Sequence, residues 1–378
     1  MDILILGNGF DLAHDLETKY SDFLEFCKKK YSINTIGSIS NNDSFSNNFW
    51  LRHFIINEIP NNKWIDLEYE IYNVIKSISN QLFSHRNLSS VELLFPTCYE
   101  FPIDYIKDNF DLRNIVKDLK NINKKSTKLS PKEYTFSEGY YSNYLEVNFE
   151  TYKGFVNFLF EQLQEFTKMF NNYLIEEIIP NINVKKYSFA LQAHKSIRVL
   201  NFNYTNTFEK LYALKNINAE NVPQYIYIHG KADIGDTNLV LGTHSFYNNL
   251  PNEINEKIDV NFNVFKKHNQ RHSYNTIESY QELIKEINNP KKIITPIFHI
   301  IGHSLDKTDH NILKHILQTK KDATINIYYH DEEALERMIN NITEIIGEDE
   351  VMTRVRFIYQ HDAQRGILIP EQESSLKE

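Results

Sequence analysis

The sequence opens with an apolar run that ends in two closely spaced glycines, since residues 3–12 read ILILGNGFDL. The run at 3–6 has the length and composition of a buried strand, and Gly7 and Gly9 are typical of a tight turn. A helical pattern of apolar residues follows up to Cys27. GNGFD matches the G-x-G-x-x-G pattern only in part, because Leu12 stands where the third glycine is expected. We therefore predict a strand, a glycine turn and a helix that starts near Asp11.

Further apolar runs alternate with helical patterns in the second half of the chain. The runs are SIRVLNF (196–202), YIYIHG (225–230), NLVLG (238–242), IFHIIGHSL (297–305), TINIYYH (324–330) and RVRFIYQ (354–360). Alternation of strands and helices indicates a parallel sheet, which the first strand is expected to join. The predicted fold class is α/β, with a mostly parallel Rossmann-like sheet, helices on both faces and a large helical insertion.

The domain organisation follows from the same patterns. Residues 1–60 and 190–365 are expected to form a discontinuous nucleotide-binding domain, in which residues 33–62 are a polar surface excursion. Residues 61–189 are expected to form a mainly helical insertion, with a loop at 121–144 and a long amphipathic helix that ends at Pro180. Residues 366–378 are polar and read as a frayed tail.

Composition excludes several classes of protein. The 378 residues carry a net charge of −9, which argues against a basic nucleic-acid-binding surface. Two cysteines, Cys27 and Cys98, cannot form a disulfide scaffold or a four-cysteine zinc module. The start of the chain lacks a basic region, and no stretch approaches 18 consecutive apolar residues. We expect a cytoplasmic protein with no membrane partner and no metal.

Glycine positions indicate a binding crevice. The chain has only 11 glycines, whereas average usage predicts roughly 26. Five of them lie at or just after the predicted strands: Gly7, Gly9, Gly230, Gly242 and Gly302. Ligands of open parallel sheets bind outside the carboxyl ends of the strands, where glycine lets the backbone approach them. The alternative is that these glycines simply end strands.

Two polar side chains near these glycines each have two interpretations. Asp11 is a candidate for holding a ribose hydroxyl, or it caps the predicted helix. Asn203, after the strand at 196–202, is a candidate for holding a ribose hydroxyl or a water, or it is a turn residue. Asn201 and Asn206 are close enough in sequence to fill the same role.

The later strands end in further candidates. His229 precedes Gly230 at the end of a strand, a position suited to a general base, although a buried structural histidine is the alternative. Ser304 is a candidate phosphate or ribose contact. Asp309 either takes a ribose hydroxyl or caps the next helix. Glu68, in WIDLE at 64–68, either faces the crevice or lies on a solvated acidic face of a packed helix.

Six segments together resemble the bacterial abortive-infection AbiH family. They are LILGNGFDLAHDLETKYSDFL (4–24), WIDLE (64–68), NFNYTNTFE (201–209), IHGK (228–231), LVLGTH (239–244) and IIGHSLDKTDHNIL (300–313). This family is in turn similar to the sirtuin-like NAD-binding domains of antiphage defence proteins.

The resemblance implies roles for individual residues. Gly7, Asn8 and Gly9 match a segment that cradles the NAD diphosphate, and Asn203 matches an asparagine near the nicotinamide ribose. His229 matches a catalytic histidine. The remaining residues expected to contact NAD are Phe10, Asp11, Tyr204, Thr205, Gly230, Gly302, Ser304 and Asp309. Thr205 departs from the pattern, because an acidic residue is common there, and the missing zinc module argues against protein deacylation.

These features lead to three functional hypotheses. The first is an abortive-infection effector that hydrolyses NAD to nicotinamide and ADP-ribose, with His229 as the base and Asn203 positioning the water or the ribose. The second is a sensor that binds NAD or a related nucleotide without cleaving it. The third, a nuclease, is disfavoured by the negative charge. For an effector we expect a homo-oligomer and a phage-derived trigger.

Overall fold

The structure is a computed structural model in which twelve segments are described: 1–31, 48–56, 67–84, 98–102, 134–138, 144–149, 152–182, 197–212, 224–235, 238–243, 262–291 and 294–360. The chain divides into two compact units, each built from separate segments. The first unit comprises Met1–Lys19, Asn171–Val240 and Gln270–Glu378, and the second comprises Tyr20–Phe170 and Leu241–Asn269. These bounds differ from those at 60 and 190 expected from the sequence, because residues 241–269 pack with the second unit. The polar tail at 366–378 lies outside the described residues.

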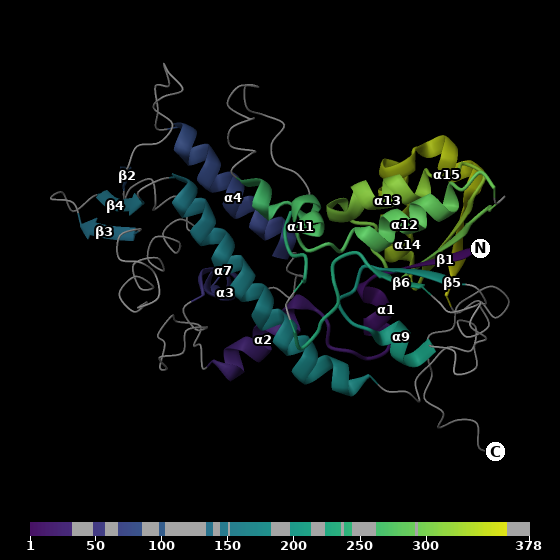
Figure 1. Cartoon of the computed structure of the whole chain (residues 1–378), viewed down its shortest axis with the longest axis horizontal. Helices are drawn as coiled ribbons and strands as arrows, with labels where there is room; N and C mark the ends of the chain where they lie inside the picture. Colours follow the sequence, from purple (N-terminus) through teal and green to yellow (C-terminus); the bar gives the residue numbers. More distant parts are fainter. Residues whose placement is uncertain are drawn as a thin grey trace. The chain divides into compact units, whose positions relative to one another are not determined.

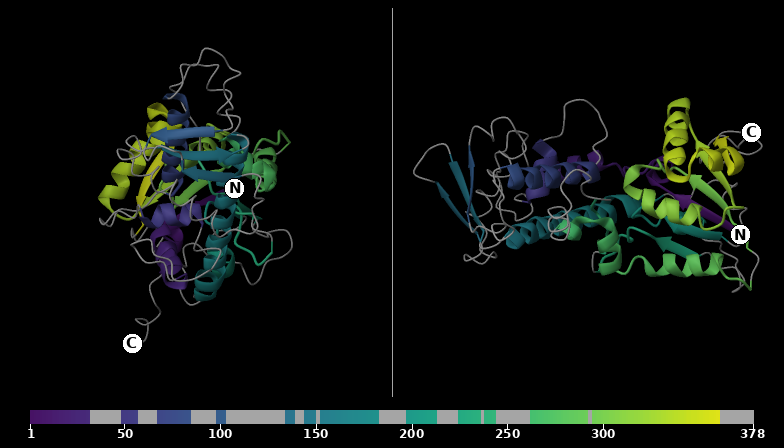
Figure 2. Two further views of the ribbon diagram at one scale, coloured as in Figure 1. Left: turned by 90° about the vertical axis from the view of Figure 1, so that its left-hand side faces the viewer. Right: turned by 90° about the horizontal axis from the view of Figure 1, so that it is seen from above.

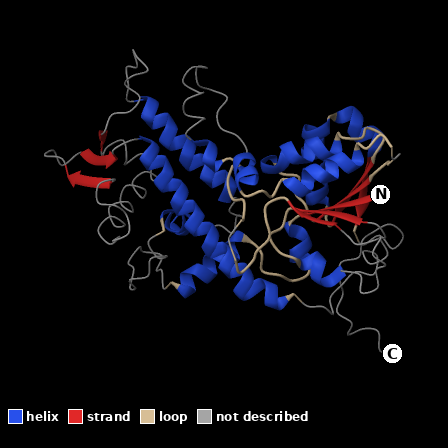
Figure 3. Cartoon of the chain, in the orientation of Figure 1, coloured by secondary structure: helices blue, strands red, loops and turns tan. Residues whose placement is uncertain are grey.

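The first unit is built on a six-stranded parallel sheet in the order β6-β5-β1-β7-β8-β9 (Figures 1 and 3). Its strands are β1 (Asp2–Leu6), β5 (Ile197–Asn201), β6 (Gln224–Tyr227), β7 (Ile297–Ile301), β8 (Thr324–Tyr329) and β9 (Val355–Tyr359). All neighbouring pairs run parallel. The predicted α/β class with a parallel sheet is therefore confirmed.

The strand order fixes where loops converge. The chain moves outward from β1 to β5 and β6, then returns to the other side of β1 to form β7, β8 and β9. Numbered by chain position, this is the 3-2-1-4-5-6 order of doubly wound nucleotide-binding folds, whose order reverses beside the first strand. Leu6 is paired in register with Asn201 on one side and Ile301 on the other. The loops that follow these strands consequently emerge at the same edge.

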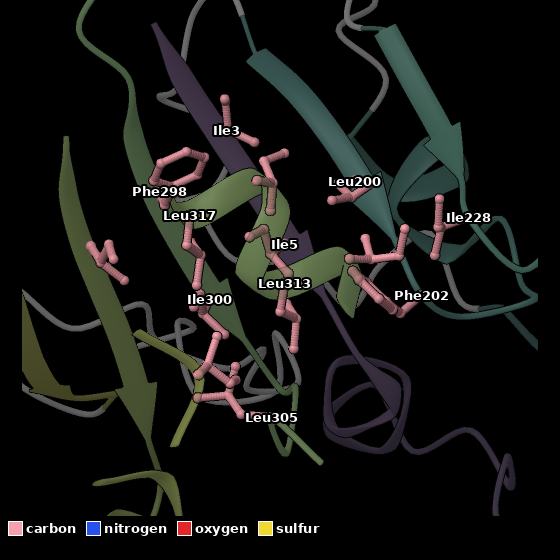
Figure 4. Packing of buried hydrophobic residues seen from close by; sticks show 14 of the residues in the cluster. Ile3, Ile5, Leu200, Phe202, Ile228, Phe298, Ile300, Leu305, Leu313 and Leu317 are labelled. Carbon is pink, nitrogen blue, oxygen red and sulfur yellow. The ribbon is translucent and has the colours of Figure 1, made fainter. Parts of the chain in front are cut away.

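One face of the sheet is covered by α12 (Glu278–Ile287), α13 (His310–Leu317) and α14 (Glu332–Ile346). Figure 4 shows Leu313 and Leu317 of α13 lying over Ile5 and Ile300 of the central strands. All four side chains are fully buried. Figure 2 shows the three helices, coloured green to yellow, along the sheet. Burial of this apolar face supplies the main stabilisation of the unit, at about 25 cal/mol per Å² of apolar surface.

The opposite face is covered by two short helices, α1 (Asn8–Ala13) and α9 (Thr207–Tyr212). The rings of Phe10 and Phe208 lie 5.9 Å apart, and Phe208 lies 6.4 Å from Tyr225 of β6, as measured between ring centroids. The sheet therefore carries helices on both faces, as predicted. The unit ends with α15 (Glu348–Arg354), which leads into β9.

One predicted strand is wrong. The run at 238–242 forms no strand, and residues 238–243 are irregular apart from an isolated bridge between Thr243 and Lys266. The amide of Val240 donates to the carbonyl of His229 at 2.8 Å. The apolar side chains of this run are buried without their backbone joining the sheet, which explains why composition alone suggested a strand.

The second unit combines helices with a small antiparallel sheet. Its helices are α2 (Tyr20–Lys30), α3 (Phe49–Ile56), α4 (Leu67–Ser84) and most of α7 (Tyr152–Tyr173), and α11 (Lys267–Ser273) begins in it. The sheet has the order β2-β4-β3, with β2 (Cys98–Pro102), β3 (Tyr134–Glu138) and β4 (Tyr144–Phe149). Strand β3 lies inside 121–144, where a loop was expected.

Two further expectations for this unit need correction. Helix α3 lies within the segment expected to be a surface excursion, yet Trp50 is fully buried and its indole donates to the carbonyl of Leu159 at 2.9 Å.

Glu68 does not lie on a solvated face. It is 8% exposed, and its carboxylate lies 2.5 Å from the ammonium of Lys267, which is 2% exposed. Trp64 lies outside the described residues. None of the described helices is long and apolar enough to cross a membrane.

The buried Glu68–Lys267 pair leads to a stability prediction. Lys267→Met leaves the Glu68 carboxylate buried without its cation, so we expect a loss of about 3–5 kcal/mol in the free energy of unfolding. The double variant Lys267→Met with Glu68→Leu removes both charges and is expected to recover most of that loss. Urea denaturation of the full chain measures both. A double variant no more stable than Lys267→Met contradicts the prediction.

Candidate functional site

The loop after β1 packs directly against the loop after β7. The amide of Gly7 donates to the carbonyl of Ile301 at 3.1 Å, and the amide of Gly9 donates to that of Gly302 at 2.7 Å. A Cβ atom on Gly302 would lie 2.1 Å from the nitrogen of Phe10. Glycine is therefore required here by the contact of two backbones. A bound diphosphate would find the amides of Gly7 and Gly9 already engaged.

The next residues of this loop are also held by the protein. The side-chain oxygen of Asn8 accepts a hydrogen bond from the hydroxyl of Thr18 at 2.7 Å. The ring of Phe10 is buried, with its centroid 4.5 Å from that of His14. Phe10 thus packs in the core on the face of the sheet that α1 and α9 cover. Both Asn8 and Phe10 therefore make structural contacts within the protein.

Asp11 is neither at a helix end nor exposed. Helix α1 begins at Asn8 with Gly7 at its N-cap, so the predicted start near Asp11 and the capping alternative are wrong. The carboxylate accepts a hydrogen bond from the hydroxyl of Thr205 at 2.5 Å and thereby joins α1 to the loop after β5. Burial raises the pKa of Asp11 to about 6, although hydrogen bonds, chiefly that from Thr205, act in the opposite direction.

The loop after β5 is held by hydrogen bonds of its asparagine side chains. Asn201 accepts from the amide of Asn203 at 2.9 Å and donates to the carbonyl of Thr205 at 3.1 Å, so Asn201 shapes the turn. The side chain of Asn203 crosses to the neighbouring loop and donates to the carbonyl of Gly7 at 3.0 Å. The hydroxyl of Tyr204 donates to the carbonyl of Val240. Asn203 therefore lies at the predicted edge and links two loops there.

His229 follows β6 and faces a carboxylate. Its Nε2 lies 3.0 Å from Oδ1 of Asp309, and the residue is only 3% exposed. The next residue, Gly230, has φ +82°, and a Cβ there would lie 2.2 Å from the carbonyl oxygen of Asn238. Only glycine fits this turn, which places the imidazole at the carboxyl edge of the sheet. The structure brings together His229 and Asp309, which are 80 positions apart in the sequence.

Asp309 is the centre of a cluster of charged and polar groups. It occupies the N-cap position of α13 but makes no side-chain capping bond, so the capping alternative is wrong. Its Oδ1 also accepts from Nη2 of Arg271 at 3.3 Å, and Nε2 of His303 lies 3.9 Å from its Oδ2. All four residues are between 3% and 9% exposed. We call His229, Arg271, His303 and Asp309 the Asp309 cluster.

Sequence reasoning missed two members of this cluster. His303 stands between two predicted site residues, Gly302 and Ser304. The motif was therefore recognised from the sequence, but the proximity of His303 to Asp309 was not predicted. Arg271 lies on α11, far in sequence from any predicted strand end, and no spacing signal pointed to it. For Ser304, the described contact is through its backbone carbonyl, which accepts from the side chain of Asn341 at 2.9 Å.

The cluster places an imidazole beside a buried carboxylate. Among the described residues, no group of three or more His, Cys, Asp or Glu side chains is arranged to hold a metal ion. A carboxylate that faces one imidazole nitrogen favours a proton on that nitrogen and makes the other nitrogen the basic one. Nε2 of His229 lies within ion-pair distance of Oδ1 of Asp309, so the carboxylate would stabilise a protonated imidazole.

The contact of the two glycine loops predicts a large effect of one methyl group. Gly302 has φ +63°, and its missing Cβ faces backbone atoms that cannot move aside cheaply. Gly302→Ala is expected to lower the free energy of unfolding by about 2–4 kcal/mol. Gly235→Ala, with no atom within 4 Å of the added Cβ, is the matched control and should change it by less than about 0.5 kcal/mol. Equal stability of the two variants in urea contradicts the packing argument.

The raised pKa of Asp11 predicts a pH dependence. Because the ionised carboxylate is disfavoured by burial, its ionisation lowers stability as the pH rises from about 4 through 6, by on the order of 2–3 kcal/mol. Asp11→Asn removes this loss, so the difference between variant and wild type should grow by that amount between pH 4 and 7. Denaturant titrations at several pH values measure it, with exposed Asp349→Asn as control. A constant difference across this range contradicts the prediction.

Comparison with known proteins matches most of the chain to one family. The family model described as "Bacteriophage abortive infection AbiH" matches residues 3–331, a range that includes every member of the Asp309 cluster and both glycine loops. None of the curated proteins matches the sequence. The chain therefore belongs to the AbiH family, whose description indicates a role in abortive infection by bacteriophage.

Proposed function

We propose that this protein acts in abortive infection by hydrolysing the nicotinamide–ribose bond of NAD at the carboxyl edge of its parallel sheet. The observation that carries the proposal is the pairing of His229 with Asp309, at 3.0 Å, at the edge where doubly wound folds bind nucleotides. Water and NAD give nicotinamide, ADP-ribose and one proton, so the site needs a base. His229 supplies it.

The proton path follows from the orientation of the imidazole. With Nε2 directed at Asp309, Nδ1 of His229 takes the proton from the attacking water or from a ribose hydroxyl. The carboxylate stabilises the imidazolium that forms, and the same oxygen of Asp309 also accepts a hydrogen bond from Arg271. Such positioned acid–base catalysis contributes roughly 10²–10⁴-fold to a rate.

Phosphate binding requires a donor other than the one suggested by the sequence. The amides of Gly7 and Gly9 already donate to protein carbonyls, so the glycine turn shapes the edge without offering these two hydrogens. Arg271 is the buried cation of the Asp309 cluster, and the planar guanidinium matches the geometry of a phosphate group. It is the group suited to the anionic part of the nucleotide.

The test is chromatography of NAD incubated with the purified full chain. We expect nicotinamide and ADP-ribose in equal amounts from the wild type. His229→Ala should slow their formation at least about 100-fold while NAD binding, measured by calorimetry, changes only a few-fold. Exposed His330→Ala is the matched control and should behave as wild type, since His330 lies outside the Asp309 cluster.

Two outcomes contradict the hydrolase proposal in different ways. Wild-type protein that binds NAD but releases no nicotinamide supports the sensor hypothesis. Protein that neither binds nor cleaves NAD removes the NAD assignment and leaves only the family role.

A further inference from the structure

The turn that carries His229 packs against segment 238–240. The amide of Val240 donates to the carbonyl of His229 at 2.8 Å. The two segments approach closely, because a Cβ on Gly230 would lie 2.2 Å from the carbonyl oxygen of Asn238. Val240 is fully buried, so its hydrogen bond to the turn is shielded from water. The backbone position of His229 therefore depends on where segment 238–240 lies.

Tyr204, in the loop after β5, holds segment 238–240 through its side chain. The hydroxyl of Tyr204 donates to the carbonyl of Val240 at 2.9 Å. The backbone carbonyl of Tyr204 accepts from the amide of Ala232 at 2.8 Å, just beyond the turn that carries His229. Tyr204 thus joins the end of this turn to the segment that supports it.

The ring of Tyr204 also borders the imidazole of His229. The centroids of these two rings lie 6.1 Å apart, and their planes are tilted by 40°. Phe202, from the same loop, makes an edge-to-face contact with the same imidazole, with the centroids 5.5 Å apart. Both separations are typical of favourable aromatic contacts. The loop after β5 therefore restricts the orientation of the imidazole as well as the position of its backbone.

We propose that Tyr204 is a positioning residue, whose hydroxyl holds segment 238–240 against the turn of His229 and so keeps the imidazole in place. The family resemblance implies a different role for Tyr204, a contact with NAD. A tyrosine hydroxyl has one proton, and that of Tyr204 is donated to the carbonyl of Val240. The effect on catalysis rests on the proposed hydrolysis of NAD, whereas the hold on segment 238–240 does not.

One substitution removes this hydrogen bond and little else. Tyr204→Phe keeps the ring but leaves the buried carbonyl of Val240 without the hydroxyl. Tyr173→Phe is the matched control, because the hydroxyl of Tyr173 also donates to a backbone carbonyl, that of Glu17, at 2.6 Å. Both variants lose one hydrogen bond of the same kind, so we expect similar decreases in Tm. Differences between them then report position rather than stability.

The first measurement is hydrogen exchange of single backbone amides in the full chain without NAD. The rate for the Val240 amide is divided by that for the Ile300 amide in the central strand β7, which reports global unfolding. Tyr204→Phe should raise this ratio at least about ten-fold, because loss of a buried hydrogen bond favours local opening, whereas Tyr173→Phe should leave it within about two-fold. An unchanged ratio in Tyr204→Phe, or the same change in both variants, overturns the proposal whether or not the protein cleaves NAD.

The second measurement is the rate of NAD hydrolysis. Tyr204→Phe should lower kcat at least about ten-fold with KM within about two-fold of wild type, since a displaced base slows proton transfer without removing a contact to NAD. Tyr173→Phe should keep both constants within about two-fold of wild type.

Two kinetic results overturn the proposal. An unchanged kcat in Tyr204→Phe shows that the hydroxyl does not position His229 for catalysis, and a raised KM with that kcat indicates a contact with NAD instead. Wild-type protein without hydrolase activity overturns the proposed function, and the exchange of the Val240 amide then decides the positioning role by itself.

Discussion

The backbone contact between the loops after β1 and β7 is the constraint on which the rest of the first unit depends. The hydrogen bond from Gly9 to Gly302 joins the N-terminal strand to a strand almost 300 positions later, where the order of the sheet reverses. Only glycine permits two backbones to approach this closely. The same contact fixes the edge at which the loops after β5 and β6 also arrive, and so it determines where the Asp309 cluster lies.

Asp309 shows how a single carboxylate organises that edge. Three side chains from three segments face it, and each is at least nine-tenths buried. A buried carboxylate is tolerated only when cations or donors compensate its lost hydration. His229 and Arg271 share one of its oxygens, and His303 faces the other. The cluster therefore meets a requirement of burial and also holds an imidazole beside a carboxylate.

Much of the fold was predictable because apolar periodicity records it directly. Strands β1, β5, β7 and β8 lie where the apolar runs placed them, and the parallel arrangement followed from their alternation with helices. The run at 238–242 misled for the same reason, since buried apolar side chains do not require a backbone ladder. The strands of the second unit were missed because their segments are polar and aromatic without clear alternation. Glu68 was misjudged because its partner Lys267 is nearly 200 positions away.

The sequence by itself determined the α/β class, the family resemblance and the position of His229 and Asn203 at strand ends, because these depend on local composition and spacing. Tertiary structure alone decided what each polar group contacts. It placed Asp309, for which the sequence left a ribose contact and a helix cap open, beside His229. It also brought Arg271 and His303 to this carboxylate and showed that the amides of Gly7 and Gly9 donate to protein carbonyls. The physical reason is that hydrogen bonds and ion pairs join residues that are close in space, whereas periodicity reports only neighbours along the chain.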